Sequence, residues 1–187
     1  MSSGAGLFTV LLMVLEWAHP GLPSALKPVC DPRVLDRFIR EAQDTEVAMR
    51  RCRRDCGLSQ SLTVPLTSVD FAAWEKKDVQ AQAEEVQSGL WMLGQAIDVV
   101  RASVSNTALH TVLDNSYSNI HSIRQVIRTL NIQVSCGDWS PSSAESVRSG
   151  TWQVSSMPDL FRVQTNFLRG KVRLLLSHAP ACHWDSG

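Results

Sequence analysis

The sequence contains little that would suggest an enzyme or a nucleic-acid-binding protein. Its 18 basic and 18 acidic side chains cancel, so the overall charge favours neither a polyanionic nor a polycationic partner. It has no pair of histidines at metal-ligand spacing, no Gly-x-Ser-x-Gly motif and no phosphate-binding loop. We therefore expect no catalytic residue, no metal or other cofactor, no nucleic-acid partner and no enzymatic activity.

The sequence also lacks an apolar run of the roughly 20 residues that would cross a membrane. Residues 6–18 form a shorter run, which is followed by Pro20, Gly21 and Pro23. Its length favours the core of a signal peptide, although Glu16 interrupts it and no basic segment precedes it; a buried N-terminal helix is the alternative. We predict a signal peptide over about residues 1–25 and a mature domain over 26–187, secreted to the extracellular space and not embedded in a membrane.

All the cysteines of this chain lie after the predicted signal peptide, and export would place them in an oxidising compartment. Cys52 and Cys56 are one helical turn apart and close enough to pair locally. Cys30 and Cys182 lie at the two extremes of the mature chain, where a bridge would tie its ends together. Zinc binding by Cys52 and Cys56 would need two more ligands, and no paired Cys or His motif supplies them. Cys136 is left over in a polar loop.

Apolar residues make up 44% of the chain, enough for one domain with a core, and they recur at helical spacing in four segments. These helices are expected at about residues 31–51, 77–104, 108–134 and 157–176. The first begins with Asp31 and Pro32, a helix cap followed by a proline at the first helical position. The second and third carry heptad seams typical of bundle packing. Their positions are Val79, Ala83, Val86, Leu90, Leu93, Ile97, Val100 and Val104, and Leu109, Leu113, Ser116, Ile120, Ile123, Ile127, Leu130 and Val134.

The lengths of the connections predict how these helices are arranged. Only residues 105–107 separate the second from the third, so these two should be antiparallel neighbours. The connections over 52–74 and 135–156 are long and contain Gly, Pro and many Ser residues, which allows the chain to return along the bundle and restart in the same direction. The predicted fold is all-α, an up-up-down-down long-chain four-helix bundle with two long overhand loops.

Gly170 lies inside the most strongly helical stretch of the chain. A glycine within a helix costs roughly 1 kcal/mol relative to alanine, and it is retained most readily where another group must approach the helix closely. A basic stripe surrounds it on the polar side of the helix, formed by Arg162, Asn166, Arg169 and Arg173. We interpret the glycine and the stripe as a docking surface, with an ordinary solvated helix face as the alternative.

Five short segments carry a resemblance to a known family. They are CDPRVL at 30–35, LTVP at 62–65, VDFAAW at 69–74, LFRV at 160–163 and NFLRGK at 166–171. Together they resemble the erythropoietin family of long-chain four-helix cytokines over essentially the whole mature chain. The cysteine framework, with disulfides Cys30–Cys182 and Cys52–Cys56, agrees with that family.

The resemblance implies a secreted, monomeric hormone that binds two chains of the erythropoietin receptor. It further implies JAK–STAT signalling that drives erythroid proliferation, survival and differentiation. One alternative is another helical cytokine, such as a thrombopoietin-like factor. A second is a secreted helical carrier of lipid or another small apolar ligand, against which the narrow apolar seams of the second and third helices argue.

The family pattern implies two receptor-binding faces of unequal strength. Face 1, the tighter, comprises Arg162, Asn166, Arg169, Gly170, Arg173 and Leu174 from the fourth helix, with Thr67, Ser68, Val69, Asp70 and Phe71 from the first long loop. Face 2 comprises Val34, Arg37 and Phe38 from the first helix, with Ser118, His121, Ser122 and Val126 from the third. Phe71, Arg169 and Arg37 are the expected energetic anchors, since arginine and aromatic residues dominate such interfaces. For Phe38, packing in the core is the alternative role.

The chain departs from the family pattern at several positions. Ser68 stands where a lysine is common, and His121 stands where an arginine is expected at the centre of face 2. A histidine is neutral for much of its population near pH 7, so the charge of face 2 differs from the usual one. No Asn-x-Ser/Thr sequence is present, which predicts that N-glycosylation is absent, and Cys136 has no counterpart in the family's framework.

Overall fold

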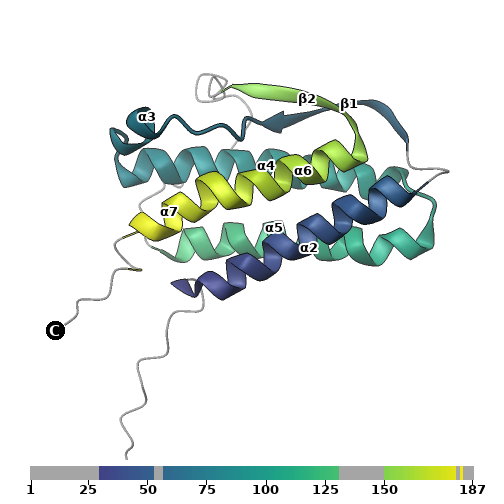
Figure 1. Ribbon diagram of the computed structural model, residues 1–187, viewed down its shortest axis with the longest axis horizontal. Coiled ribbons are helices and arrows are strands. Elements are labelled where there is room, and N and C mark those ends of the chain that lie inside the picture. The colour runs from purple at the N-terminus through teal and green to yellow at the C-terminus, as the bar shows by residue number, and fades with distance from the viewer. Residues whose placement is uncertain (1–29, 53–56, 131–149, 180–181, 183–187) are drawn as a thin grey trace, which may run out of the picture.

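The computed structural model describes residues 30–52, 57–130, 150–179 and 182, and shows a bundle of helices with a two-stranded sheet along one side (Figure 1). In chain order the elements are α2 (Pro32–Arg51), β1 (Gly57–Pro65), α3 (Phe71–Glu75), α4 (Val79–Ser103), α5 (Thr107–Thr129), β2 (Thr151–Ser156), α6 (Met157–Phe167), the π-helical turn η3 (Leu168–Val172) and α7 (Arg173–His178). The prediction of a helical bundle is confirmed. Within these ranges no helix combines the length and apolar character needed to cross a bilayer. The predicted signal peptide and Cys136 lie outside the described residues.

The main helices begin where side chains cap them. Asp31 before α2, Asp78 before α4, Asn106 before α5 and Ser156 before α6 each accept a hydrogen bond from a backbone N–H of the first turn. Such caps satisfy donors that have no partner within the helix. The start of α2 was predicted from its cap, and the starts of the other three were predicted from apolar periodicity; all four agree with the structure to within about two residues.

The heptad seams of α4 and α5 form a large part of the core of the bundle, and buried residues of α2 and α6 add to it. The buried seam residues are Ala83, Val86, Leu90, Leu93, Ile97, Val100, Val104, Leu109, Leu113, Ser116, Ile120, Ile123, Ile127 and Leu130. Val79 is only half-buried, and Val134 lies outside the described residues. α4 packs against α5, and α2 packs against both α6 and α5. The two heptad patterns therefore correctly predicted which side of each helix is buried.

The two long connections were predicted as loops, and this prediction is wrong for much of the described part. β1 and β2 pair as antiparallel strands, with Leu62 opposite Val154 and Val64 opposite Trp152. Leu62, Val64 and Val154 are buried, and β1 packs against α4. Each strand is a short apolar–polar alternation among Ser and Gly residues, and its partner lies about 90 residues away. The local sequence therefore could not show the pairing.

A short helix, α3, follows β1 and was also not predicted. Asp70 caps it by accepting a hydrogen bond from the backbone N–H of Ala73, at 3.2 Å. Trp74, near its end, is buried in the core. Gln82 of α4 donates a hydrogen bond from Nε2 to the backbone oxygen of Trp74, at 3.0 Å. These contacts fix the second half of the connection against α4.

Two helices approach each other closely at Gly89 of α4. A Cβ atom at this position would lie 2.2 Å from Cζ of Phe167, whose ring is fully buried at the end of α6. Gly89 therefore permits an approach between α4 and α6 that alanine would prevent without displacement of the ring. The sequence had pointed to Gly170 as the glycine of close approach, and Gly89 was not recognised.

A disulfide joins the two ends of the described chain. Cys30 and Cys182 are bonded with their Cα atoms 5.3 Å apart, which confirms the predicted pairing. The bridge holds the start of α2 close to the residues that follow α7. Cys52 also takes part in a disulfide. Its expected partner, Cys56, lies outside the described residues, so that pairing stays a prediction.

We predict that replacing both cysteines, Cys30→Ser with Cys182→Ser, lowers the free energy of unfolding by about 4–5 kcal/mol. The bridge closes 152 residues of chain, and its loss restores the entropy of the unfolded ensemble. Denaturant titration followed by far-ultraviolet circular dichroism measures the change. A loss below about 1 kcal/mol would show that the bridge contributes little to stability.

Candidate functional site

The two predicted halves of face 1 lie next to each other in the structure. The side chains of Arg162, Asn166, Arg169 and Arg173 are exposed along α6, η3 and α7, whereas Gly170 and Leu174 are half-buried. In the connection after β1, Ser68, Asp70 and Phe71 are exposed and Thr67 and Val69 are half-buried. A Cβ atom at Gly170 would lie 3.6 Å from Cγ2 of Val69 and 3.7 Å from the backbone oxygen of Thr67. The structure therefore brings together the helical and loop residues of face 1.

This contact changes the interpretation of Gly170. The group that approaches the glycine is the connection of the same chain, and at 3.6 Å an added Cβ would make ordinary van der Waals contact. Gly170 also lies in the π-helical turn η3, which interrupts the regular helix predicted over 157–176. A π turn inserts one residue into the helix and occurs frequently at functional sites. Because an added Cβ atom at Gly170 would make only ordinary contacts, close packing does not require a glycine at this position.

The charges of the stripe are only partly compensated. Arg162 forms an ion pair with Asp159 in the preceding turn, and Arg173 forms one with Asp36 of α2. Both pairs are exposed and should contribute little to stability. Among the residues that the structure describes, none forms an ion pair with Arg169. Its guanidinium group is therefore the cation of the stripe that is best placed to pair with a group on another molecule.

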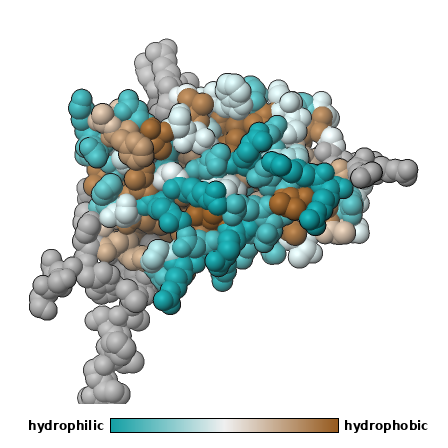
Figure 2. All heavy atoms as spheres, viewed as in Figure 1, coloured by the Kyte–Doolittle hydropathy of each residue, from teal (hydrophilic) through white to brown (hydrophobic). Residues whose placement is uncertain are grey.

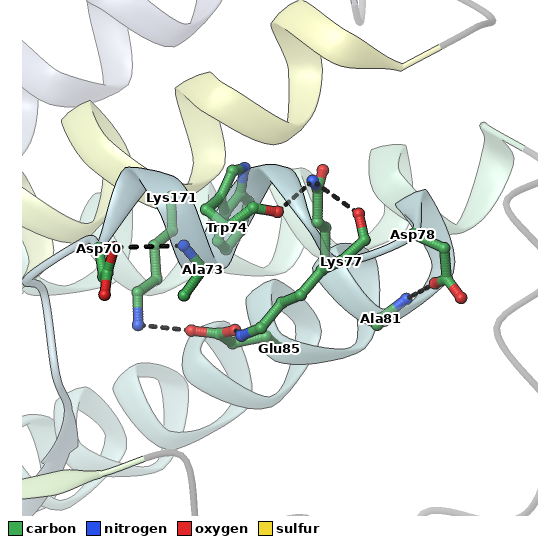
Figure 3. A network of polar contacts seen from close by, with 9 residues as sticks. Asp70, Ala73, Trp74, Lys77, Asp78, Ala81, Glu85 and Lys171 are labelled. Atoms are coloured by element: carbon green, nitrogen blue, oxygen red, sulfur yellow. Dashed lines mark hydrogen bonds and ion pairs between the residues drawn. The ribbon is translucent and has the colours of Figure 1, made fainter.

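A half-buried carboxylate, that of Glu85, contacts the helical part of face 1 through Lys171 (Figure 3). Lys171 of η3 contacts Glu85 of α4, with 2.7 Å between Nζ and Oε1 and side chains that are only 8% and 12% exposed. Lys77, just after α3, forms an ion pair with the other oxygen of Glu85, and its ammonium group lies 5.8 Å from the ring of Trp74. Glu85 thereby joins the π turn, α4 and the end of the first connection.

These neighbours determine the protonation of Glu85. Burial raises the pKa of its carboxyl group, but hydrogen bonds and charges from Lys171 and Lys77 outweigh burial. The net pKa therefore lies below its ordinary value of 4.5. The carboxylate consequently stays ionised at neutral pH. This group could not be predicted from the sequence, because Glu85 and Lys171 are distant in the chain and neither spacing nor motif relates them.

The residues of face 2 come from α2 and α5, which pack against each other. Arg37, Ser118 and His121 are exposed, and Val34, Ser122 and Val126 are half-buried. Phe38 is only 8% exposed and belongs to the core, which favours the alternative role that the sequence left open for it. The guanidinium group of Arg37 lies 5.1 Å from the centre of the Phe38 ring.

The hydropathy of the surface seen in Figure 2 changes along the length of the molecule. Hydrophilic residues predominate over the middle, where Figure 1 places α6 and α2, and hydrophobic residues gather toward the end that carries α3. At that end, Phe71 of face 1 exposes 62% of its surface. The charged stripe and this exposed aromatic ring give face 1 both polar and apolar groups.

We predict that Glu85→Gln lowers the free energy of unfolding by about 3 kcal/mol at neutral pH, since it leaves Lys171 buried without its counter-ion. The pKa of Glu85 is lower in the folded than in the unfolded chain. Its stabilisation is therefore fully present above about pH 4.5 and is lost as the pH falls through the folded-state value. Denaturation measured from pH 7 to pH 3 should show the variant and the unmodified chain converging in acid.

Glu84→Gln is the matched control for this experiment. Glu84 is the neighbouring residue of α4, is half-buried and accepts a hydrogen bond from Gln80. It should show a much smaller loss of stability. A difference between Glu85→Gln and the unmodified chain that stays constant across the pH range would contradict the assigned ion pairs.

Comparison with known proteins supplies the family. The sequence profile described as erythropoietin/thrombopoietin matches residues 27–185. The erythropoietin of Epinephelus coioides is 56% identical over 97% of this chain and 96% of its own length. The erythropoietin of Danio rerio is 50% identical over 97% of each chain, and that of Sus scrofa is 38% identical over 94% of this chain and 93% of its own. The chain therefore belongs to the erythropoietin/thrombopoietin family, whose members are cytokine hormones and not enzymes.

Proposed function

We propose that this chain is a secreted hormone of the erythropoietin type, which acts by bridging two chains of the erythropoietin receptor. The observation that carries the proposal is the similarity to erythropoietins over nearly the full length of the chain, in fish and in mammals. Receptor bridging would activate JAK–STAT signalling and drive erythroid proliferation, survival and differentiation. The Cys30–Cys182 disulfide supports export, because such bonds persist in oxidising compartments. We assign residues 1–25 to the signal peptide and 26–187 to the hormone.

We further propose the up-up-down-down topology with two long overhand connections. The disulfide, which places the start of α2 beside the end of the chain's helical part, supports this arrangement. So does the short link between α4 and α5, which suits antiparallel neighbours. The antiparallel pairing of β1 with β2 is compatible with two connections that run along the same side of the bundle.

Face 1 is the proposed tighter site. Its loop and helix residues lie side by side at Gly170, which supports a surface that is assembled before a partner binds. Pre-assembly lowers the entropic cost of association. Arg169, which lacks an ion pair in the described ranges, and the exposed ring of Phe71 are the proposed anchors.

Face 2 is the proposed weaker site. Once face 1 holds the hormone at a membrane, the second receptor chain meets it at a high effective concentration, so a weak contact suffices. Arg37 is the proposed anchor of this face, and His121 supplies less positive charge than the usual arginine. The histidine should therefore make this contact weaker than it is in relatives that carry arginine.

The alternatives are less well supported. The matching profile includes thrombopoietin, but the named relatives that match at 37–56% identity are erythropoietins. A carrier of small apolar ligands would need a larger, more apolar site. The cavity between the first connection and α4 measures about 220 Å³, and Lys77, Glu85 and Lys171 form part of its wall. Small-molecule sites usually measure about 300–1,000 Å³ and are mostly apolar.

We predict that Arg169→Glu weakens binding to the receptor ectodomain of the same species by about 30-fold or more, because it reverses the charge of a proposed anchor. Surface plasmon resonance on immobilised ectodomain measures this at limiting receptor density. Arg51→Glu, an equal charge change at an exposed position outside both faces, is the control and should bind normally. Unchanged affinity of a folded Arg169→Glu variant would refute the assignment of face 1.

We predict opposite effects from two substitutions at His121. His121→Arg should strengthen the second binding event severalfold by restoring a full positive charge, whereas His121→Glu should weaken it. Neither should alter the first event. The response of reporter cells that carry the receptor, together with titration of the preformed one-to-one complex, measures both effects. If neither variant changes the second event, His121 does not belong to a receptor contact.

A further inference from the structure

A polar link joins α2 and α5 beside the proposed face 2. Asn119 of α5, only 9% exposed, donates a hydrogen bond from Nδ2 to Oε2 of Glu41 on α2, at 2.5 Å. The other oxygen of Glu41, Oε1, lies 3.5 Å from Nε of Arg37, one helical turn earlier. The carboxylate of Glu41 therefore interacts both with the buried amide of Asn119 on α5 and with Arg37 on α2, the proposed anchor of face 2.

Arg37 is constrained from a second side. Its guanidinium carbon lies 5.1 Å from the centre of the Phe38 ring, and that ring is fixed in the core. The Arg37 side chain is itself 62% exposed, so its charge remains available to a partner. An exposed arginine ordinarily samples many rotamers, and ordering it on binding reduces affinity. Here the ring and the carboxylate both restrict that freedom before binding.

We propose that Glu41 and Asn119 are positioning residues of face 2. Glu41 orients the guanidinium group of Arg37, and Asn119 fixes Glu41 and holds α2 against α5 at this level. Hydrogen bonds to an ionised carboxylate are stronger than neutral ones, and the low exposure of Asn119 protects the bond from competing water. Neither residue is part of the face as the sequence predicted it. The inference rests on the proposed function, in which Arg37 contacts the second receptor chain.

The chain contains a matched control on the same helix. Glu46 forms an ion pair with Arg50 at 2.5 Å with the same four-residue spacing, at the far end of α2 from face 2. If Glu41 acted only as one more helix-stabilising charge, then Glu46→Gln and Glu41→Gln would have the same effect on binding. A role in positioning Arg37 predicts that only Glu41→Gln affects the second binding event.

The test is a double-mutant cycle measured on the second binding event. One-to-one complexes of hormone with the receptor ectodomain of the same species are titrated with further ectodomain in a calorimeter. Glu41→Gln and Asn119→Leu should each weaken this event about three- to tenfold and leave the first event unchanged. In an Arg37→Ala background, Glu41→Gln should add less than about a twofold effect, because the residue that it positions is gone.

Each outcome tests either face 2 itself or the positioning role of Glu41 within it. If Arg37→Ala leaves the second event unchanged, face 2 itself is refuted. If Arg37→Ala weakens it but Glu41→Gln does not, face 2 stands and the positioning role is refuted. An equal effect of Glu41→Gln with and without Arg37 would also overturn the positioning role, and would make Glu41 an independent contact. Circular dichroism and thermal midpoints establish that each variant is folded, and Asn119→Leu tests the same link should Glu41→Gln fail to fold.

Discussion

The packing of the Phe167 ring against Gly89 is the contact on which the rest of the structure depends. The absence of a side chain at Gly89 lets the ring at the end of α6 reach the backbone of α4. The π turn begins directly after this ring, and Lys171 within it reaches Glu85, four residues before Gly89. The connection after β1 then rests on Gly170 through Thr67 and Val69. The apolar contact thus sets the depth at which the last helical segment lies, and the buried ion pair fixes its position there.

Both proposed faces share one physical arrangement. Next to each face, one carboxylate contacts two donor groups from different parts of the chain. Glu85 contacts Lys171 and Lys77 near face 1, and Glu41 contacts Asn119 and Arg37 near face 2. Under face 1 the group is nearly buried and its pKa is lowered, so the arrangement supports stability. Beside face 2 it is partly exposed, so its main effect is to orient a side chain that remains available for binding. Neither carboxylate belongs to the predicted faces themselves.

The sequence predicted what depends on short-range order. Heptads identified the buried sides of α4 and α5, and the cap Asp31 with Pro32 identified the start of α2, because both signals span only a few residues. Several contacts between residues far apart in the chain could not be predicted. The pairing of Val64 with Trp152, the approach of Phe167 to Gly89 and the contact of Lys171 with Glu85 leave no mark within any single segment. The π turn was missed for a related reason, since its residues have ordinary helical periodicity. For the candidate site, family resemblance supplied the list of residues, and the structure supplied their contacts and the carboxylates behind them.

The central proposal is that one hormone chain binds two receptor chains through two unlike surfaces. The most direct test is the mass of the complex in solution, measured by sedimentation with the receptor ectodomain of the same species first limiting and then in excess. We predict a one-to-one complex when the receptor is limiting and a complex of one hormone with two receptor chains when it is in excess. A complex that stays one-to-one at every ratio would contradict the two-face mechanism.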